Sequence, residues 1–145
     1  MSGPITEQLM GRHQRDIAHR RLCHALFDAI ERGDLDAVAG CYAPDMTLWF
    51  NVTGREHTRE ENLAALAAGS SRHRRRTYDD RVINTFDDGF VVQYTVGIVR
   101  HDGTRSALWA CLVAEVRDGL IVRVREYLDG GKFAPPTIAA TEDPS

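Results

Sequence analysis

The hydrophobic and polar positions of this chain follow one period in its first half and another in its second. From Gly11 to Arg32, apolar side chains recur at the spacing of one helix face: Ile17, Leu22, Ala25, Leu26, Ala29 and Ile30. In the second half, stretches rich in Val, Ile, Thr, Tyr, Phe and Trp lie between turn signals, which is typical of strands. The pattern therefore predicts helices first and a sheet second.

Boundary residues divide the helical half into separate elements. Gly33 is placed to end the first helix, and Asp34 is placed to cap the next one. Pro44 ends the helical pattern, because proline disfavours α geometry in the residue before it. Thr58 and Glu61 form a capping-box pattern that begins a third helix. The predicted elements are a helix over residues 11–32, a second from Asp34 to near Tyr42, a strand over Met46–Val52 and a helix from Thr58 to Gly69.

Three Asp-Gly pairs divide the second half, at Asp88-Gly89, Asp102-Gly103 and Asp118-Gly119. Asp-Gly supplies the positive φ angles that tight hairpin turns require. Three such turns predict four consecutive antiparallel strands, over residues 74–86, 90–101, 104–117 and 120–129.

Together these elements predict an α+β fold, a cone-shaped α+β barrel. In it, three N-terminal helices pack on a strongly curved, mostly antiparallel sheet that ends in a four-stranded meander. A sheet bent around the first helix encloses a cavity. Residues 1–10 and 132–145 lack periodicity and are expected to be flexible, so the predicted domain covers residues 11–131. Alternation places Trp109, Cys111 and Val113 on one face of their strand, but leaves open which face points inward.

Composition narrows the classes of protein further. The chain has 145 residues, a net charge of −3 and 27% charged residues, which do not direct it to nucleic acid or to a membrane. Its three cysteines lie in apolar stretches, so we expect buried, reduced thiols and a cytoplasmic protein. Neither a phosphate-binding glycine loop nor a set of metal ligands is recognisable, so no cofactor and no metal are expected.

One basic run, Arg72 to Arg76, stands out in this acidic chain. It is short and has no interleaved aromatic residues, so we interpret it as a solvated approach to the following strand. The alternative is a basic lip over the pocket that recruits an acidic ligand.

Two segments carry a resemblance to a known family. Gly33–Trp49, and the Asp118-Gly119 turn leading into Glu126–Asp129, resemble the nuclear transport factor 2-like superfamily. The similarity is to its SnoaL-like branch, which contains polyketide cyclases, limonene epoxide hydrolases and ketosteroid isomerases, and it covers residues 11–131. The resemblance implies a cavity for a small molecule and a homodimer formed through the sheet.

The resemblance also implies roles for particular residues. Limonene epoxide hydrolases use an aspartate near the end of the last strand, which Asp129 matches. They hold the attacking water with an asparagine, which Asn51 matches, and with a tyrosine, whose place Trp49 takes. Their arginine and second aspartate have no counterpart in Val91–Ile98, and the base of the ketosteroid isomerases would fall near Phe50.

The candidate site follows from the residues and from the resemblance together. An aspartate surrounded by aromatic rings has a raised pKa, which suits a general acid or base. The predicted catalytic residues are Asp129, Asn51 and Tyr94, and the predicted ligand-binding residues are Trp49, Trp109, Tyr127, His57, Cys111 and Val113.

Structural roles remain open for several of these residues. Asp129 can instead cap the strand end, the tryptophans can pack in the core, and His57 can be a solvated loop residue. Glu115 and Glu126 can be second pocket acids, but ion pairs with neighbouring arginines are the default interpretation. Three functions therefore remain: a hydrolase, isomerase or cyclase acting on a small hydrophobic or planar molecule, a binding protein without chemistry, and a dimerisation or protein-interaction module.

Overall fold

The computed structural model describes residues 4–129, with side chains from Gly11 onward. The predicted tail 132–145 lies outside the described residues. The helices and strands are α1 (Pro4–Glu31), α2 (Leu35–Cys41), β1 (Tyr42–Phe50), β2 (Arg55–Thr58), α3 (Arg59–Arg72), β3 (His73–Phe86), β4 (Gly89–Arg100), β5 (Arg105–Arg117) and β6 (Leu120–Leu128).

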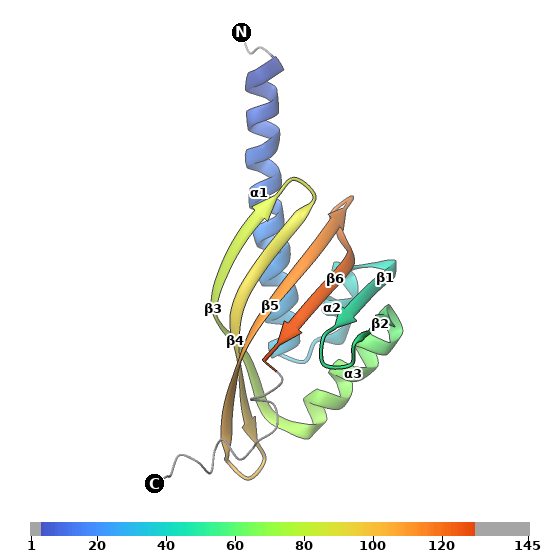
Figure 1. The fold of residues 1–145 in the computed structure, drawn as a ribbon, viewed down its shortest axis with the longest axis vertical. Helices are drawn as coiled ribbons and strands as arrows, with labels where there is room; N and C mark the ends of the chain where they lie inside the picture. The colour runs from blue at the N-terminus through green and yellow to red at the C-terminus, as the bar shows by residue number, and fades with distance from the viewer. Residues whose placement is uncertain (1–3, 130–145) are drawn as a thin grey trace.

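The six strands form one curved sheet in the order β2-β1-β6-β5-β4-β3. Strands β1 and β6 are parallel, and every other neighbouring pair is antiparallel. Helix α1 runs along one face of the sheet, and α3 lies beside the end that β1 and β2 form (Figure 1). The sheet bends but does not close, because β2 and β3 remain its edges. The predicted α+β cone with its four-stranded meander is confirmed.

The core lies between α1 and the concave face of the sheet. The buried face of α1 includes Cys23, Leu26, Phe27 and Ala29. The Phe27 ring is centred 4.8 Å from the Tyr78 ring and 4.7 Å from the Tyr94 ring, so the first helix packs on β3 and β4 through aromatic contacts. Along β4, buried side chains recur at every second position, as a half-buried strand requires: Phe90, Val92, Tyr94, Val96 and Ile98.

All three predicted hairpins are present, although their turns differ. Asp118 and Gly119 both have positive φ, 53° and 79°, as the prediction assumed. The turn before β4 is different, because Gly89 already pairs with Phe86 in the ladder. A Cβ on Gly89 would lie 1.9 Å from the Ala114 carbonyl oxygen, so this glycine permits close approach of two strands.

The helix starts agree with the capping patterns. The Asp34 side chain accepts a hydrogen bond from the Ala37 N–H at 3.0 Å. Thr58 accepts from the Glu61 N–H at 3.1 Å, and Glu61 accepts from the Thr58 N–H at 2.9 Å. The predicted N-cap of α2 and the predicted capping box of α3 are therefore confirmed.

Other boundaries differ from the prediction. Helix α1 begins at Pro4 rather than at Gly11, since proline is well suited to the first helical position. Helix α3 continues past Gly69 to Arg72. Strand β2 was not predicted, because its four residues are mostly polar and pair only with β1. None of the helices among the described residues is both long and apolar enough to span a bilayer.

Candidate functional site

A cavity of about 360 Å³ lies between α3 and the concave face of the sheet, which we call the cone cavity. Most of its wall is apolar and comes from β1, β4, β5 and α3. Its polar groups come mainly from β2, α3, β3 and β6. The apolar wall includes Leu48, Phe50, Leu66, Val96, Ile98, Leu108 and Leu128, and the polar groups include His57, Asn62, His73, Arg76, Tyr78 and Glu126.

Glu126 is the acid of the cone cavity. Alternation along β6 turns Glu126 inward with Val124, and turns Arg125 to the other face. The Tyr94 hydroxyl, on β4, donates a hydrogen bond to the Glu126 carboxyl at 2.9 Å. Burial raises the pKa of Glu126, while this hydrogen bond and the positive charge of Arg76 act against that rise.

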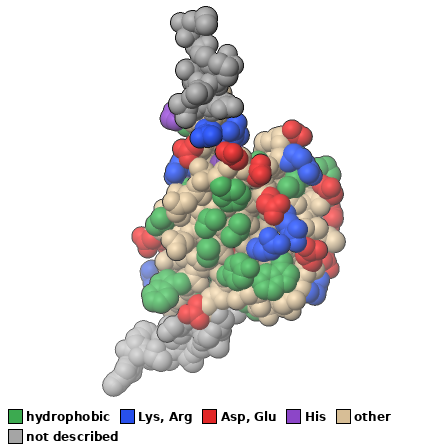
Figure 2. Space-filling view, turned by 45° about the horizontal axis from the view of Figure 1, so that its top comes forward, with side chains coloured by type: hydrophobic (Ala, Val, Ile, Leu, Met, Phe, Trp, Pro, Cys, Tyr) green, Lys and Arg blue, Asp and Glu red, His purple; other side chains and the backbone are tan. Residues whose placement is uncertain are grey.

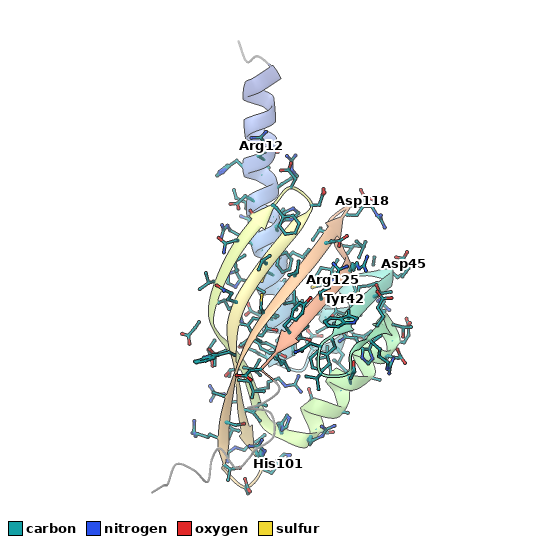
Figure 3. The ribbon with its side chains drawn as sticks, viewed as in Figure 1. Arg12, Tyr42, Asp45, His101, Asp118 and Arg125 are labelled. Carbon is teal, nitrogen blue, oxygen red and sulfur yellow. The ribbon has the colours of Figure 1, made fainter. Side chains whose placement is uncertain are left out.

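The default interpretation of Glu126 as an ion-pair partner of an arginine is wrong. Arg125 pairs instead with Glu115 at 3.7 Å, and Arg123 pairs with Glu56 at 3.8 Å. Arg125 projects from β6 on the face of the sheet opposite α1 (Figure 3). The prediction that Glu115 pairs with an arginine is confirmed, whereas Glu126 lines the cavity because the pleat turns it inward.

Buried tyrosines surround the acid and position polar groups near it. The pKa of Tyr94 is raised well above its usual value, first by burial and then by the neighbouring Glu126 charge. Tyr78 meets Tyr94 edge to face, with ring centres 5.5 Å apart. The Tyr42 hydroxyl donates to the Asn62 side-chain oxygen at 2.8 Å, which leaves the amide nitrogen as the group that Asn62 can offer a ligand.

Of the predicted site residues, Tyr94 and His57 lie on the inner side of the sheet. Tyr94 is 4% exposed and contacts the cavity acid. His57 lies on β2, opposite Leu48, and forms part of the cavity wall. Its Nε2 atom is 2.8 Å from the Thr53 hydroxyl, which orients the ring. The unpredicted strand β2 is what places His57 there.

The predicted aromatic residues come together on the outer face of the sheet. Trp109 is 73% exposed and Tyr127 is 42% exposed. The Trp49 and Tyr127 rings are centred 5.4 Å apart. Alternation places Cys111 and Val113 on the same face as Trp109, and Figure 2 shows hydrophobic side chains gathered there among charged ones. We call this surface, formed by Trp49, Trp109, Cys111, Val113 and Tyr127, the outer aromatic patch.

Asp129 and Asn51 lie at the end of β6. Asp129 lines a wide, open depression of about 550 Å³ together with Trp109 and Tyr127, and its N–H donates to the Trp109 carbonyl at 3.1 Å. The Asn51 amide exchanges two hydrogen bonds with the backbone of Leu128, at 2.9 and 2.8 Å. Both polar groups of this amide therefore fasten the end of β1 to β6. Asn51 also donates its N–H to the Glu126 carbonyl at 3.1 Å, but neither Asn51 nor Asp129 lines the cone cavity, and their predicted catalytic roles stay predictions.

The three cysteines form no disulfide bond. Cys23, Cys41 and Cys111 are all free, as predicted, and burial raises the pKa of Cys23 to about 12. Cys23 and Cys41 are buried, while Cys111 is only partly so. Within residues 11–129, no three His, Cys, Asp or Glu side chains cluster closely enough to hold a metal ion.

The chain belongs to the SnoaL-like domain family, whose sequence pattern matches residues 23–124. This match confirms the resemblance to the SnoaL-like branch of the nuclear transport factor 2-like superfamily. None of the curated proteins compared with the chain matches it.

Solved structures agree with this assignment. A candidate polyketide cyclase from Xanthomonas campestris is 25% identical, with a TM-score of 0.74 over 82% of this chain and 96% of the other. A limonene epoxide hydrolase-like epoxide hydrolase from M. tuberculosis is 21% identical, with a TM-score of 0.67 over 81% and 86%. A protein with a ketosteroid isomerase-like fold from Catenulispora acidiphila, in complex with trimethylamine, is 17% identical, with a TM-score of 0.66 over 73% and 83%.

Sequence analysis left Glu126 open as a second pocket acid but took an ion pair with an arginine as the default, although a signal for its inward position existed. On β4, Gln93 and Thr95 are the polar members of the alternation, so Tyr94 belongs to the inward set. Trp109 pairs with Thr95, and must therefore share its outward face. The same argument along β6 turns Arg125 outward and Glu126 inward.

Proposed function

We propose that this protein binds a small hydrophobic or planar molecule in the cone cavity and catalyses proton transfer on it, as a hydrolase, isomerase or cyclase. The observation that carries the proposal is the Glu126 carboxyl, held by the Tyr94 hydroxyl at 2.9 Å in a largely apolar cavity. Burial raises the pKa of this carboxyl above its usual value. A carboxyl group with a raised pKa can both accept and return a proton.

The chemistry can be written for a ligand with a carbonyl group. The Glu126 carboxylate removes a proton from the carbon beside the carbonyl, and the electron pair of that C–H bond forms a new C–C π bond. The carbonyl π pair moves to oxygen, which gives an enolate. The Asn62 amide nitrogen lies in the same wall as a donor for that oxygen. Where the enolate is conjugated with a C=C bond, return of the proton to the far carbon of that system completes an isomerisation. In a ring closure, the enolate carbon attacks a second carbonyl carbon, the π pair of that carbonyl moves to its oxygen, and this oxygen takes the proton from Glu126.

A hydrolase uses the same group differently. Glu126 then removes a proton from a water molecule, whose oxygen attacks an epoxide carbon as the ring C–O bond at that carbon breaks. The electron pair of the broken bond stays on the epoxide oxygen, which takes the proton back from Glu126. The similarity to a candidate polyketide cyclase and to an epoxide hydrolase supports proton transfer as the shared class of reaction. In this proposal Glu126 takes the role predicted for Asp129, since Glu126 lines the cone cavity and Asp129 lines the outer depression.

The test uses two probes that fit an apolar cavity. Exchange of the α-protons of 1-indanone in D2O, followed by proton NMR, reports enolate formation, and opening of styrene oxide reports water activation. We expect wild-type protein to accelerate at least one reaction and Glu126→Gln to slow it about 100-fold or more. Glu115→Gln, on the outer face, is the matched control and should keep the wild-type rate. Failure of the wild type in both assays, or full activity of Glu126→Gln, contradicts the proposal.

We also propose a second role, a homodimer formed through the outer face of the sheet. Trp109 and Tyr127 are large apolar side chains left exposed on that face, as aromatic anchors of interfaces are. The neighbouring Arg125 and Glu115 give the face both signs of charge. A two-fold axis that passes close to this pair can set each arginine against the partner's glutamate, and the occupant we infer is a second copy of this chain.

A further inference from the structure

We propose that the ligand of the cone cavity carries an anionic oxygen group, a carboxylate or a phosphate, and that Arg76, His73 and Arg72 bind it at the edge of the cavity. This inference rests on the proposed function, because it concerns the same cavity. It assigns a role to the basic run Arg72 to Arg76, which acid/base chemistry at Glu126 does not use.

The Arg76 side chain lies in the wall of the cone cavity, against helix α3. Its guanidinium enters the cavity wall and donates to the Tyr78 hydroxyl at 3.4 Å. A Cβ on Gly69 would lie 1.8 Å from a terminal nitrogen of that guanidinium, so the Arg76 side chain packs directly against Gly69 of α3. Arg76 is partly buried, unlike Arg74 and Arg75, which are exposed and do not line the cone cavity.

His73 places a further polar side-chain atom in the wall of the cone cavity. It caps α3, and its backbone N–H donates to the Gly69 carbonyl. Its Nδ1 atom is buried and has no hydrogen-bond partner among the described residues. A buried nitrogen without a partner costs free energy, which an anionic oxygen atom would recover. One terminal nitrogen of Arg100, the residue paired with His73 across the sheet, is also buried without a hydrogen-bond partner among the described residues.

The surroundings of His73 are positively charged. The pKa of His73 is lowered first by burial, and then by the charges of Arg76, Arg100, Arg72 and His101. His101 lies at the tip of the β4–β5 hairpin, at the end of the sheet where these residues gather (Figure 3). In the part of the chain that the structure describes, none of these arginines has a carboxylate within ion-pair distance.

Arg81 provides a contrast on the same strand. It pairs with Asp28 at 2.9 Å and with Glu31 at 3.3 Å, so its charge is neutralised inside the fold. Among the residues that the structure describes, Arg76 has no such ion pair. Its positive charge acts to lower the pKa of Glu126 without an ion pair between them. Planar guanidinium groups bind carboxylate and phosphate oxygens in pairs, which defines the class of ligand group.

The test compares three probes with one ring system: 1-naphthoate, 1-naphthyl phosphate and the neutral 1-naphthamide. Isothermal titration calorimetry measures their affinities for the whole protein. We expect the wild type to bind at least one anion about tenfold or more tighter than the amide, as charged hydrogen bonds require. Arg76→Gln should remove that preference, whereas Arg74→Gln, from the same basic run, should keep it. The tighter of the two anions identifies the group.

Equal binding of the anions and the amide overturns the inference. An equal loss of preference in Arg74→Gln and Arg76→Gln also overturns it, since it would indicate general surface charge. If thermal melting shows that Arg76→Gln does not fold, the exposed Arg72→Gln serves as the second cavity variant, with the same expected loss. Binding of the amide with no anion preference removes this inference alone, because the proposed function needs only the cavity and Glu126. Absence of binding by all three probes contradicts both.

Discussion

The two faces of one sheet use similar residues for different purposes. On β6, Glu126 faces the cone cavity, while its neighbour Arg125 faces outward and pairs with Glu115 at 3.7 Å. The inner carboxyl has a tyrosine hydroxyl as its partner and a pKa raised by burial. The outer carboxyl is an exposed ion-pair partner of small energetic value. A shift of one residue along a strand therefore separates the buried acid of the cone cavity from a surface charge.

Aromatic residues differ between the two faces in the same way. Tyr94 is 4% exposed and holds the cavity acid, whereas Trp109 is 73% exposed and contributes little to the core. The inner face combines the core with the cavity that Glu126 lines. The outer face offers area for contact with another molecule. Each prediction below changes one face and leaves the other intact.

The largest expected effect concerns the packing behind the site. Phe27→Ala removes the ring that packs between Tyr78 and Tyr94, and should lower the free energy of unfolding by about 3–5 kcal/mol. Val82→Ala, at an exposed position of β3, should change it by less than about 0.5 kcal/mol. Urea unfolding followed by circular dichroism measures both. Equal losses would mean that the inner face is not the core.

The next prediction concerns the outer aromatic patch and the proposed homodimer. Trp109→Glu places a charge at the most exposed aromatic position and should weaken dimerisation by about 2 kcal/mol or more. Size-exclusion chromatography with light scattering, over a range of concentrations, measures the mass. Gln14→Glu, at an exposed position of α1, is the control and should remain a dimer. A wild-type protein that is monomeric throughout this range would end the dimer proposal.

Filling the cone cavity with a larger side chain should weaken ligand binding. Leu66 lines the cavity from α3, so Leu66→Trp should weaken binding of 1-naphthamide about tenfold or more. Ala67 is the next residue of the same helix, is exposed and does not line the cavity. Ala67→Trp should therefore leave the affinity unchanged. Calorimetry that finds the reverse order would place the ligand outside the cone cavity.

The smallest expected effect is a shift in pH dependence. The Tyr94 hydrogen bond lowers the pKa of Glu126, so Tyr94→Phe should raise it further. Because the carboxylate is the base, the rate of proton exchange rises with pH through this pKa, and its midpoint should move to higher pH. Tyr127→Phe, on the outer face, should leave the midpoint in place. A midpoint that moves down in Tyr94→Phe would contradict the assigned hydrogen bond.

Local signals explain why most of the fold was predictable. The capping box of Thr58 and Glu61 lies within one helical turn, and the Asp118-Gly119 turn depends only on its own backbone angles. Such features are fixed by residues close in sequence. Strand β2 escaped prediction because it is short and polar and exists only as a partner of β1.

The site was less predictable, because it depends on which face of the sheet the first helix covers. Alternation grouped Trp109 with Cys111 and Val113 but did not orient the group. Phe27 of α1 settles the matter, since it packs on Tyr94 and so makes that face the inner one. Cross-strand pairing then turns Trp109 outward and Glu126 inward. The position of Arg76 against Gly69 is likewise a contact between two elements that no local pattern signals.

The most direct test of the account sets the two faces against each other in one assay. Rates of α-proton exchange of 1-indanone are measured by proton NMR for the wild type, Glu126→Gln and Asp129→Asn. We predict that Glu126→Gln loses about 100-fold or more of the rate, while Asp129→Asn stays within about twofold of the wild type. A large loss in Asp129→Asn together with an unchanged rate in Glu126→Gln would contradict the account and place the chemistry on the outer face.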